Sequence, residues 1–355
     1  MQVTNLLRLR TQFVGALMLS ISFVSNAFET ESTTSSSNPN AKVAIALHGG
    51  AGTISKANLN AEQEKAYRAI LEQALRAGYR ALQAGEDGSV AVITAIQIME
   101  DSPLFNAGVG AVYTYDEEHE LDASIMHGRT KQAGAVAGVK HIKSPIAAAN
   151  LVMTESVHVM LTGGGAEDFA FKHGLEKVDN SVFNTERRKK ALDSAKAKIQ
   201  ANEQAFFANP ENADYKFGTV GVVVLDSNGN LVAGTSTGGM TAKRFGRIGD
   251  SPIIGAGTYA DNDSCAVSGT GHGEYFIRFN VAADICARVK YQDKTIEVAA
   301  NEVVNQVLAE AGGTGGVIAM DNQGNISMPF NTEGMYRASI DTSGKVTIGI
   351  YGSEK

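Results

Sequence analysis

Hydrophobic and polar positions follow clear local periods in this chain, and each period predicts one kind of element. The apolar run 43–47 ends in a glycine-rich loop at 48–52, which predicts a buried strand followed by a loop. Apolar side chains between 61 and 84 fall on one stripe of a helix, and Gly85 is a suitable C-terminal cap. The segment 89–100 is apolar on most faces, which predicts a buried helix.

Two hairpin patterns dominate the second half of the chain. The apolar runs 220–225 and 231–236 flank Asn228-Gly229, and the runs 317–320 and 326–328 flank a similar polar turn. Strands placed in this way, with helical patterns between them, predict two sheets covered by helices. Further elements are expected as strands near 111–114 and 121–126 and as helices at 145–153, 165–173, 273–290 and 295–310.

The first 27 residues are expected to be a removable leader. Arg8 and Arg10 precede an apolar run that ends in Ser25-Asn26-Ala27, the pattern of a secretory signal peptide cut after Ala27. The run is short for a membrane span, and a membrane anchor or a disordered leader is the alternative. We therefore expect a secreted or periplasmic protein with no membrane segment in its mature form. The polar segment 28–41 is expected to be a disordered spacer.

The composition is that of an acidic globular protein. The 355 residues are 43% hydrophobic and 19% charged, and their net charge of −7 offers no basic footprint for nucleic acid. Cys265 and Cys286 are expected to be unpaired buried thiols, with pairing in an oxidising compartment as the alternative. The one clear shift in composition is the charged segment 184–217, which is expected to be a flexible linker with helical parts.

This linker stops directly before Gly218-Thr219, which carries the first candidate chemistry. Threonine is a weak nucleophile inside a chain, but an N-terminal threonine has its own α-amine as a base. Cleavage of the bond before Thr219 would therefore create a nucleophile. The alternative is a β-branched residue that simply opens a strand.

Two other kinds of site are weighed and set aside. Residues 234–238 match G-x-S-x-G, but this segment is expected to end a hairpin strand, whereas a hydrolase nucleophile elbow turns from a strand into a helix. The spacing of histidine, cysteine and acidic residues matches no transition-metal or EF-hand motif.

The segment 218–278 concentrates hydroxyls, glycines and charges. Thr219, Thr237 and Thr270 supply hydroxyl groups, and the neighbouring glycine amides are able to face an oxyanion. Arg247 and Asp250 are three residues apart. Such a pair forms a plain salt bridge or holds the carboxylate and the ammonium of a free amino acid.

With this segment the chain resembles the plant-type isoaspartyl peptidase/L-asparaginases, a family of N-terminal-nucleophile hydrolases, from Lys42 to Ile340. The resemblance implies a four-layer αββα sandwich, with a single domain from 42 to 355. His127-Gly128 departs from the Asp-Gly that is common in the family, which leaves the local charge open. The motifs that carry the resemblance are His48-Gly49-Gly50-Ala51-Gly52, Pro103-Leu104-Phe105-Asn106-Ala107-Gly108, Glu120-Leu121-Asp122-Ala123-Ser124 and Pro329-Phe330-Asn331-Thr332-Glu333-Gly334-Met335.

The resemblance implies the catalytic residues. Thr219 is the implied nucleophile after self-cleavage at Gly218–Thr219, and Thr237 is implied to support its hydroxyl group. Thr270 and the amide of Gly271 resemble the oxyanion hole of the family.

The resemblance also implies binding residues. Asn106 is implied to contact the nucleophile region, and Arg247, Asp250 and Gly273 resemble the residues that bind the aspartyl group. No cofactor is implied for catalysis. A structural Na⁺ is implied in a loop that would bind it through the backbone carbonyls of Met99, Glu100, Ser102, Phe105, Ala107 and Val109.

The implied activity is the hydrolysis of isoaspartyl dipeptides and of the side-chain amide of L-asparagine, with release of L-aspartate. Self-cleavage would leave an α-subunit, 28–218, and a β-subunit, 219–355, and the family implies a dimer of such αβ units. Two alternatives stay open. One is a glycosylasparaginase that acts on glycan-linked asparagine, and the other is an uncleaved, non-catalytic scaffold protein.

Overall fold

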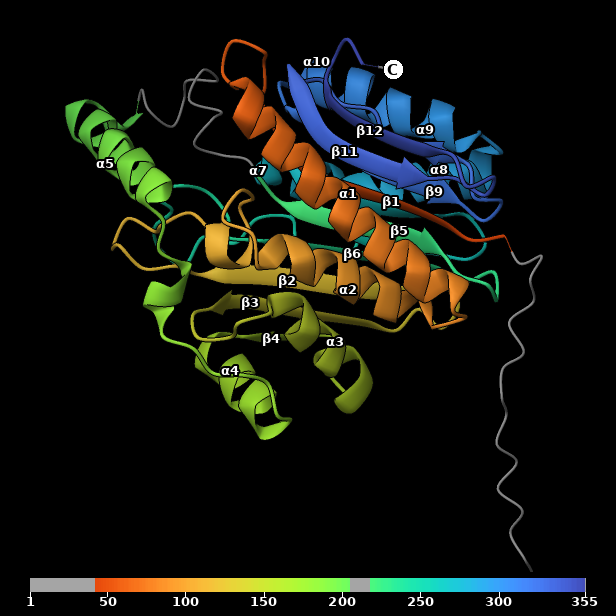
Figure 1. The fold of residues 1–355 in the computed structure, drawn as a ribbon, viewed down its shortest axis with the longest axis horizontal. Coiled ribbons are helices and arrows are strands. Elements are labelled where there is room, and N and C mark those ends of the chain that lie inside the picture. Colours follow the sequence, from red (N-terminus) through yellow and green to blue (C-terminus); the bar gives the residue numbers. More distant parts are fainter. Residues whose placement is uncertain (1–41, 205–217, 355) are drawn as a thin grey trace, which may run out of the picture. The chain divides into compact units, whose positions relative to one another are not determined.

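Two β-sheets lie face to face between two layers of helices (Figure 1). The computed structural model describes residues 42–204 and 218–354, and these belong to one structural unit. The expected signal peptide, 1–27, and the expected spacer, 28–41, lie outside the described residues.

The larger sheet has the strand order β12-β11-β1-β5-β6-β2-β3-β4. Neighbouring strands are antiparallel except for β3 and β4, which are parallel. The strands at its centre are buried along their whole length because both faces of the sheet are covered. Their bounds are β1 Ala44–Gly52, β2 Leu121–His127, β3 Ala133–Val139, β4 Met160–Thr162, β5 Val220–Leu225, β6 Leu231–Thr237, β11 Gly334–Ile340 and β12 Val346–Tyr351.

The smaller sheet packs against the centre of the larger one. Its antiparallel strands have the order β10-β9-β8-β7, and β8 and β9 contact β1, β5 and β6 of the larger sheet. The bounds are β7 Thr258–Ala260, β8 Cys265–Gly271, β9 Gly315–Asp321 and β10 Ile326–Ser327.

Helices cover the outer face of each sheet. On the larger sheet, α1 and α2 cross β1, β5, β6 and β11, while α3 and α4 cover β2 and β3 (Figure 1). On the smaller sheet, α8 and α9 cover β7 to β10. The bounds are α1 Ala61–Gln83, α2 Gly88–Glu100, α3 Pro145–Glu155, α4 Gly163–Lys172, α5 Glu186–Ala201, α7 Gly273–Phe279, α8 Val281–Gln292, α9 Ile296–Glu302 and α10 Ala309–Ala311, with a π-helical stretch at Val303–Leu308 and 3-10 turns at Gly108–Gly110 and Asn180–Phe183.

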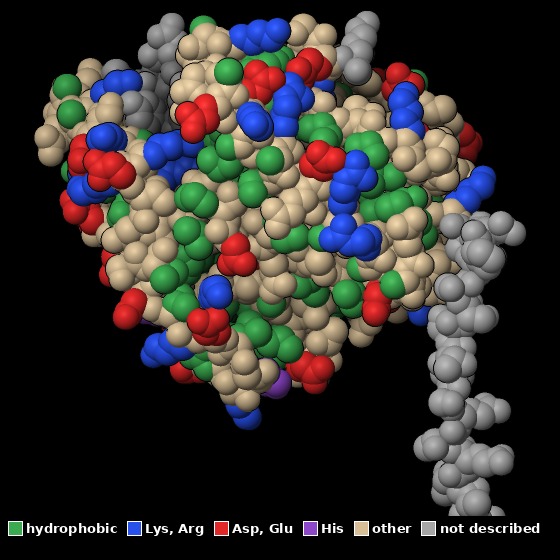
Figure 2. All heavy atoms as spheres, in the orientation of Figure 1, with side chains coloured by type: hydrophobic (Ala, Val, Ile, Leu, Met, Phe, Trp, Pro, Cys, Tyr) green, Lys and Arg blue, Asp and Glu red, His purple; other side chains and the backbone are tan. Residues whose placement is uncertain are grey.

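Three hydrophobic cores separate the four layers. One lies between α1 to α4 and the larger sheet, one between the two sheets, and one between the smaller sheet and α8 and α9. This is the αββα sandwich that the family resemblance implied. None of the described helices is long and apolar enough to cross a membrane. On the face that Figure 2 shows, acidic and basic side chains are interspersed.

Most of the elements expected from local patterns are confirmed, including both hairpins, α1, α2, α3 and α4. The strand expected at 111–114 is wrong, because the amide of Val112 bonds to the side chain of Asn106 instead of joining a sheet. The single helix expected at 273–290 is divided at Asn280, which adopts a left-handed conformation between α7 and α8.

The expected linker, 184–217, is helical over much of its length. Residues 186–201 form α5, and Leu192, Ala195 and Ile199 bury one stripe of it. Residues 205–217 lie outside the described part of the chain.

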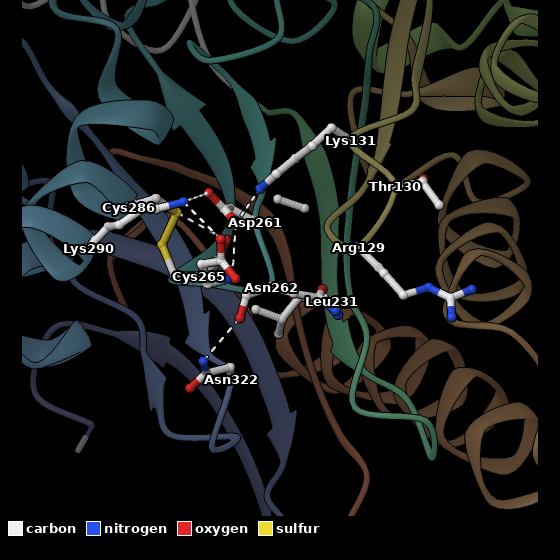
Figure 3. Close-up of polar contacts among 12 residues, drawn as sticks. Arg129, Thr130, Lys131, Leu231, Asp261, Asn262, Cys265, Cys286, Lys290 and Asn322 are labelled. Atoms are coloured by element: carbon white, nitrogen blue, oxygen red, sulfur yellow. Dashed lines mark hydrogen bonds and ion pairs between the residues drawn. A yellow bond between two sulfur atoms is a disulfide. The ribbon is translucent and has the colours of Figure 1, made fainter.

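The expectation of two unpaired thiols is wrong, since Cys265 of β8 and Cys286 of α8 form a disulfide (Figure 3). The packing of α8 onto β8 places their Cα atoms 5.2 Å apart, a separation that no local pattern predicts. Figure 3 also shows Lys131 and Lys290 reaching Asp261 beside this bond, and both form ion pairs with its carboxylate.

Candidate active site

Thr219 lies directly before β5, at the end of the larger sheet's central hairpin. Its hydroxyl group donates to Oγ1 of Thr237 over 3.1 Å, because the register that pairs Val220 with Ser236 brings the ends of β5 and β6 together. Oγ1 of Thr237 also accepts from the amide of Gly239 at 3.0 Å. The two threonines expected in the site are therefore in direct contact.

The bond before Thr219 is enclosed by glycines and by Asn106. The carbonyl of Gly218 accepts from the backbone amide of Asn106 at 2.9 Å. The side-chain amide of Asn106 donates to the carbonyl of Gly239 at 2.7 Å. Gly50 has a φ of +110°, and a Cβ atom there would lie 2.8 Å from the Cα of Gly218. Only glycine fits this position, so the C-terminal part of β1, which extends through the loop expected at 48–52, contacts the junction closely.

A buried chain of hydrogen bonds starts at the carbonyl of Thr219. That carbonyl accepts from Nδ1 of His48 at 3.1 Å, so Nδ1 carries the proton. Burial lowers the pKa of His48 to about 3, which keeps the imidazole neutral. Nε2 therefore accepts from the hydroxyl of Ser268 at 3.0 Å.

The chain continues between the two sheets as a series of buried hydroxyl groups. Ser268 contacts Thr235 at 2.7 Å, Thr235 contacts Thr258 at 2.5 Å, and Thr258 contacts Ser124 at 2.8 Å. Ser124 also donates to the carbonyl of Ser251 at 2.6 Å. A continuous polar path thus joins Thr219 to the residue that follows Asp250.

Asp250 is a buried carboxylate with an unfilled bonding position. Its side chain has no ion pair among the described residues, and its Oδ2 atom has no hydrogen-bond partner there. Burial raises the pKa of Asp250 to about 7, against the opposing charge of Arg247. A cation that entered this position would satisfy the carboxylate.

Arg247, Gly273 and Asp250 lie together. A Cβ atom on Gly273 would lie 2.8 Å from Nη2 of Arg247 and 2.9 Å from Oδ1 of Asp250, so glycine keeps this space open between the two charges. The Arg247 guanidinium is held by Glu274 through two bonds, from Nε at 3.0 Å and from Nη2 at 3.1 Å. A substrate carboxylate would have to displace Glu274.

Thr270 carries a second unfilled position. Its Oγ1 atom is fully buried and has no hydrogen-bond partner among the described residues. Thr270 and Gly271 end β8, which packs on β5 so closely that a Cβ atom on Gly221 would lie 1.9 Å from Oγ of Ser268. This packing places the end of β8 on the same side of the sandwich as the start of β5.

The expected sodium loop folds back over the C-terminal end of α2. A Cβ atom on Gly108 would lie 2.2 Å from the carbonyl oxygen of Glu100, and one on Gly110 would lie 2.0 Å from that of Phe105. Glycine is therefore required at both positions for the loop to pack this closely. The expected carbonyl donors Met99, Glu100, Ser102, Phe105, Ala107 and Val109 all belong to this turn.

The side chain of Glu100 connects the loop to the site. Its carboxylate accepts from Ser236, the neighbour of Thr237, at 2.6 Å and from Ser144 at 2.7 Å. Burial raises the pKa of Glu100 to about 7. The sequence assigned only the backbone carbonyl of Glu100 to the site.

His127, the departure from the family pattern, lies in a separate cluster. Its Nε2 atom is 3.6 Å from Oδ2 of Asp87, which caps α2, and buried Asp226 lies beside them. Nδ1 of His127 accepts from the amide of Arg129 at 3.3 Å, so the proton sits on Nε2 and faces Asp87. This close contact with His127, together with the hydrogen bond from the Ser89 amide, holds the pKa of Asp87 far below its usual range. Asp87, His127 and Asp226 thus form one polar cluster, with a ligand atom of each within 4.8 Å of the others.

The structure therefore brings the expected residues into two groups. Thr219 contacts Thr237, and Asn106 holds Gly218, while Arg247, Asp250 and Gly273 meet at the start of α7. Besides the carboxylate of Glu100, the side chains of His48 and Ser268 were not predicted to belong to the site. His48 has a local signal, because it follows the apolar run 43–47 directly before Gly-Gly, whereas Ser268 has none.

Comparison with known proteins is consistent with this geometry. Residues 41–350 match the asparaginase family. The chain is similar to the isoaspartyl peptidase of Escherichia coli (strain K12), with 50% identity over 87% of this chain and 96% of that protein. It is also similar to the isoaspartyl peptidase/L-asparaginase of Mus musculus, with 40% identity over 86% and 90% of the two chains. A probable isoaspartyl peptidase/L-asparaginase 2 of Arabidopsis thaliana shares 39% identity over 87% and 98%.

Proposed function

Since this chain belongs to the asparaginase family, we propose that it hydrolyses isoaspartyl dipeptides and the side-chain amide of L-asparagine, releasing L-aspartate. The names of the relatives support this activity, and they do not favour a glycosylasparaginase or a scaffold protein. The observation that carries the proposal is the Thr219–Thr237 contact at a Gly218–Thr219 bond enclosed by Asn106 and Gly50.

The first step in the proposal is self-cleavage. The hydroxyl of Thr219 attacks the carbonyl carbon of Gly218, and the peptide nitrogen leaves as the free α-amine of Thr219. Water then hydrolyses the resulting ester, which leaves a carboxylate on Gly218 and restores the hydroxyl group. The α-amine has a reference pKa of about 7.7–8.0, so near neutral pH a fraction of it is free to act as a base.

The second step uses the new N-terminus. The α-amine takes the hydroxyl proton as Thr219 attacks the β-carbonyl of the substrate, and a tetrahedral oxyanion forms. Oγ1 of Thr270 and the amide of Gly271 would stabilise it, each by about 3 kcal/mol. The proton then passes to the leaving amine, and water releases L-aspartate from the acyl-enzyme. Oγ1 of Thr270 has no hydrogen-bond partner within the described ranges, which supports its role as a donor.

The ammonium and the α-carboxylate of the aspartyl group would bind to Asp250 and Arg247, which lie near the start of α7. The carboxylate of Asp250 would pair with the substrate ammonium, which fills the empty position at Oδ2. Arg247 would exchange Glu274 for the substrate α-carboxylate, because both are bidentate acceptors.

Three further features belong to the same proposal. A structural Na⁺ would occupy the carbonyl-lined turn between Met99 and Val109, and two αβ units would associate as a dimer. The protein would be secreted or periplasmic after loss of residues 1–27. The Cys265–Cys286 disulfide supports that location, because such bonds persist in oxidising compartments.

The test combines gel electrophoresis with turnover. We expect two polypeptides from the wild type, with Thr219 as the N-terminus of one, and hydrolysis of β-Asp-Leu and L-asparagine. Thr219→Ala should give one full-length chain with no activity, while Thr130→Ala on the exposed β2–β3 turn should behave as the wild type. An intact wild-type chain that still hydrolyses β-aspartyl peptides would refute the mechanism.

A further inference from the structure

A cavity of about 360 Å³ borders the junction on the side of Gly218. Its lining includes Gly218 itself, Gly50 and Asn106, which contact Gly218, and Gly49. Two arginines from the first turn of α5, Arg187 and Arg188, line another side. The other described lining residues are Ala51, Gly52, Thr53, Ile54, Asn58, Leu59, Gln63, Leu104, Phe105 and Tyr336.

Arg188 is a buried cation without an anionic partner among the residues that the structure describes. Arg188 is 8% exposed, and its Nε atom donates to the carbonyl of Gly110 at 2.7 Å. No acidic residue in the described part of the chain forms an ion pair with it. Burial and the charge of Arg187 lower its pKa to about 10. A buried guanidinium that lacks an anionic partner is stabilised when a carboxylate binds to it.

Arg187 is held in place at the same cavity. Its Nη1 atom donates to the Tyr67 hydroxyl at 2.7 Å, and Tyr67 donates to the carbonyl of Leu104 at 3.0 Å. Tyr67 stacks on Tyr336, with ring centroids 4.1 Å apart. These contacts fix the direction of Arg187, so little side-chain entropy remains to be lost when it binds an anion.

The charge of the cavity is strongly one-sided. Its described lining holds two guanidinium groups and no carboxylate. The N-terminal end of α5 adds the positive end of a helix dipole. An aliphatic wall from Ile54, Leu59 and Leu104 completes the lining. A ligand that matches it carries a carboxylate and an apolar side chain.

The position of the cavity beside Gly218 indicates which part of a substrate would bind in it. The leaving amine must take its proton from the α-amine of Thr219, so it lies beside that nitrogen during the reaction. In the intact chain the same nitrogen is bonded to Gly218, which lines the cavity. The aspartyl group occupies Arg247 and Asp250, so the leaving residue is directed to the other side.

We propose that this cavity is the leaving-group subsite, in which Arg187 and Arg188 bind the α-carboxylate of the second residue of an isoaspartyl dipeptide. The inference rests on the proposed function and makes it more specific. It assigns a preference for dipeptides with a free C-terminus and an apolar second residue over peptides that continue or end in an amide. L-Asparagine releases ammonia, so it makes no use of the subsite.

The test compares three substrates: β-Asp-Leu, its C-terminal amide and L-asparagine. We expect the wild type to favour the free acid over the amide at least tenfold in kcat/KM, as for a charge-assisted contact. Arg187→Gln combined with Arg188→Gln should bring that ratio close to one and leave kcat/KM for L-asparagine within about twofold. Arg188→Lys should retain part of the preference. Arg76→Gln, an exposed arginine of α1, controls for the loss of charge.

The outcomes separate the possibilities. Equal kcat/KM for acid and amide in the wild type, or a parallel loss for L-asparagine, would overturn the subsite. Variants that alter cleavage at Gly218–Thr219 but keep the acid-to-amide ratio would assign the arginines to the chain's own Gly218 carboxylate instead. A cleaved wild type that hydrolyses none of the three would reject the proposed function. Calorimetric titration with leucine and leucinamide, which needs no turnover, still decides the subsite: equal affinities would refute it.

Discussion

Replacement of Asp250 by asparagine should stabilise the folded chain at alkaline pH while it removes the proposed ammonium partner. Asp250 is 5% exposed and lacks an ion pair within the described residues, and its Oδ2 atom has no hydrogen-bond partner there. An ionised carboxylate in this position is therefore costly to the empty enzyme. Asparagine keeps the shape of the side chain and removes the charge.

The magnitude follows from proton linkage. Burial raises the pKa of Asp250 from 3.8 to about 7, so between these values the folded chain binds more protons than the unfolded chain. The free energy of unfolding therefore falls as pH rises through this window, and the loss is complete above pH 7. At 1.36 kcal/mol per pKa unit, the penalty is about 1.7 kcal/mol at pH 5 and about 4 kcal/mol at pH 8.

The assay is urea unfolding at several pH values, with circular dichroism as the signal that monitors unfolding. Both proteins should carry Thr219→Ala, so that a single uncleaved chain unfolds. Asp250→Asn should gain about 2.5 kcal/mol relative to its parent between pH 5 and pH 8. Glu100, whose pKa is also raised to about 7, titrates in both proteins and cancels from the difference. Asp168→Asn, at an exposed acid of α4, should show no such gain.

Parallel stability curves for the parent and Asp250→Asn from pH 5 to pH 8 would refute the reasoning. They would mean that the Asp250 carboxylate already has a partner in the folded chain. The proposal that Asp250 binds the substrate ammonium group would then lose its support. In the cleaved enzyme the same substitution should raise KM for L-asparagine, because the ammonium loses its counter-charge.

Two further perturbations test other parts of the structure. Replacing Cys265 and Cys286 by alanine opens a loop with a sequence separation of 21 and should lower the free energy of unfolding by about 3 kcal/mol; equal urea midpoints for oxidised and reduced wild type would contradict this. Glu274→Gln releases Arg247 from its bidentate partner and should lower KM for L-asparagine a few-fold, whereas Glu297→Gln on α9 should not; a higher KM in Glu274→Gln would show that Glu274 orients Arg247 for binding.

Elements with a complete hydrophobic period were predictable, and those without one were not. The hairpin of β5 and β6 and the stripe of α1 have such periods, and both were located to within a few residues. Strand β8 was missed, because its sequence from Cys265 to Gly271 mixes small polar and apolar residues. It becomes a strand because β7 and β9 pair with it and both of its faces are covered.

The same distinction holds for the site. The contact of Thr219 with Thr237 follows from the hairpin register, so a local pattern places the two residues together. The contact of His48 with Ser268 joins strands of different sheets that are 220 residues apart. No period in either segment specifies how the two sheets stack.

By itself the sequence determined the Gly218–Thr219 junction, the helices and hairpins with regular periods, and the family resemblance that names the reactive residues. The tertiary structure alone decided that Cys265 and Cys286 pair, that Asp250 is buried without an ion pair among the described residues and that Arg188 faces a cavity beside Gly218. The physical reason is that pairing, burial and pKa depend on which surfaces meet across the sandwich. Those contacts join residues far apart in the chain, whereas periodicity reports only on neighbours.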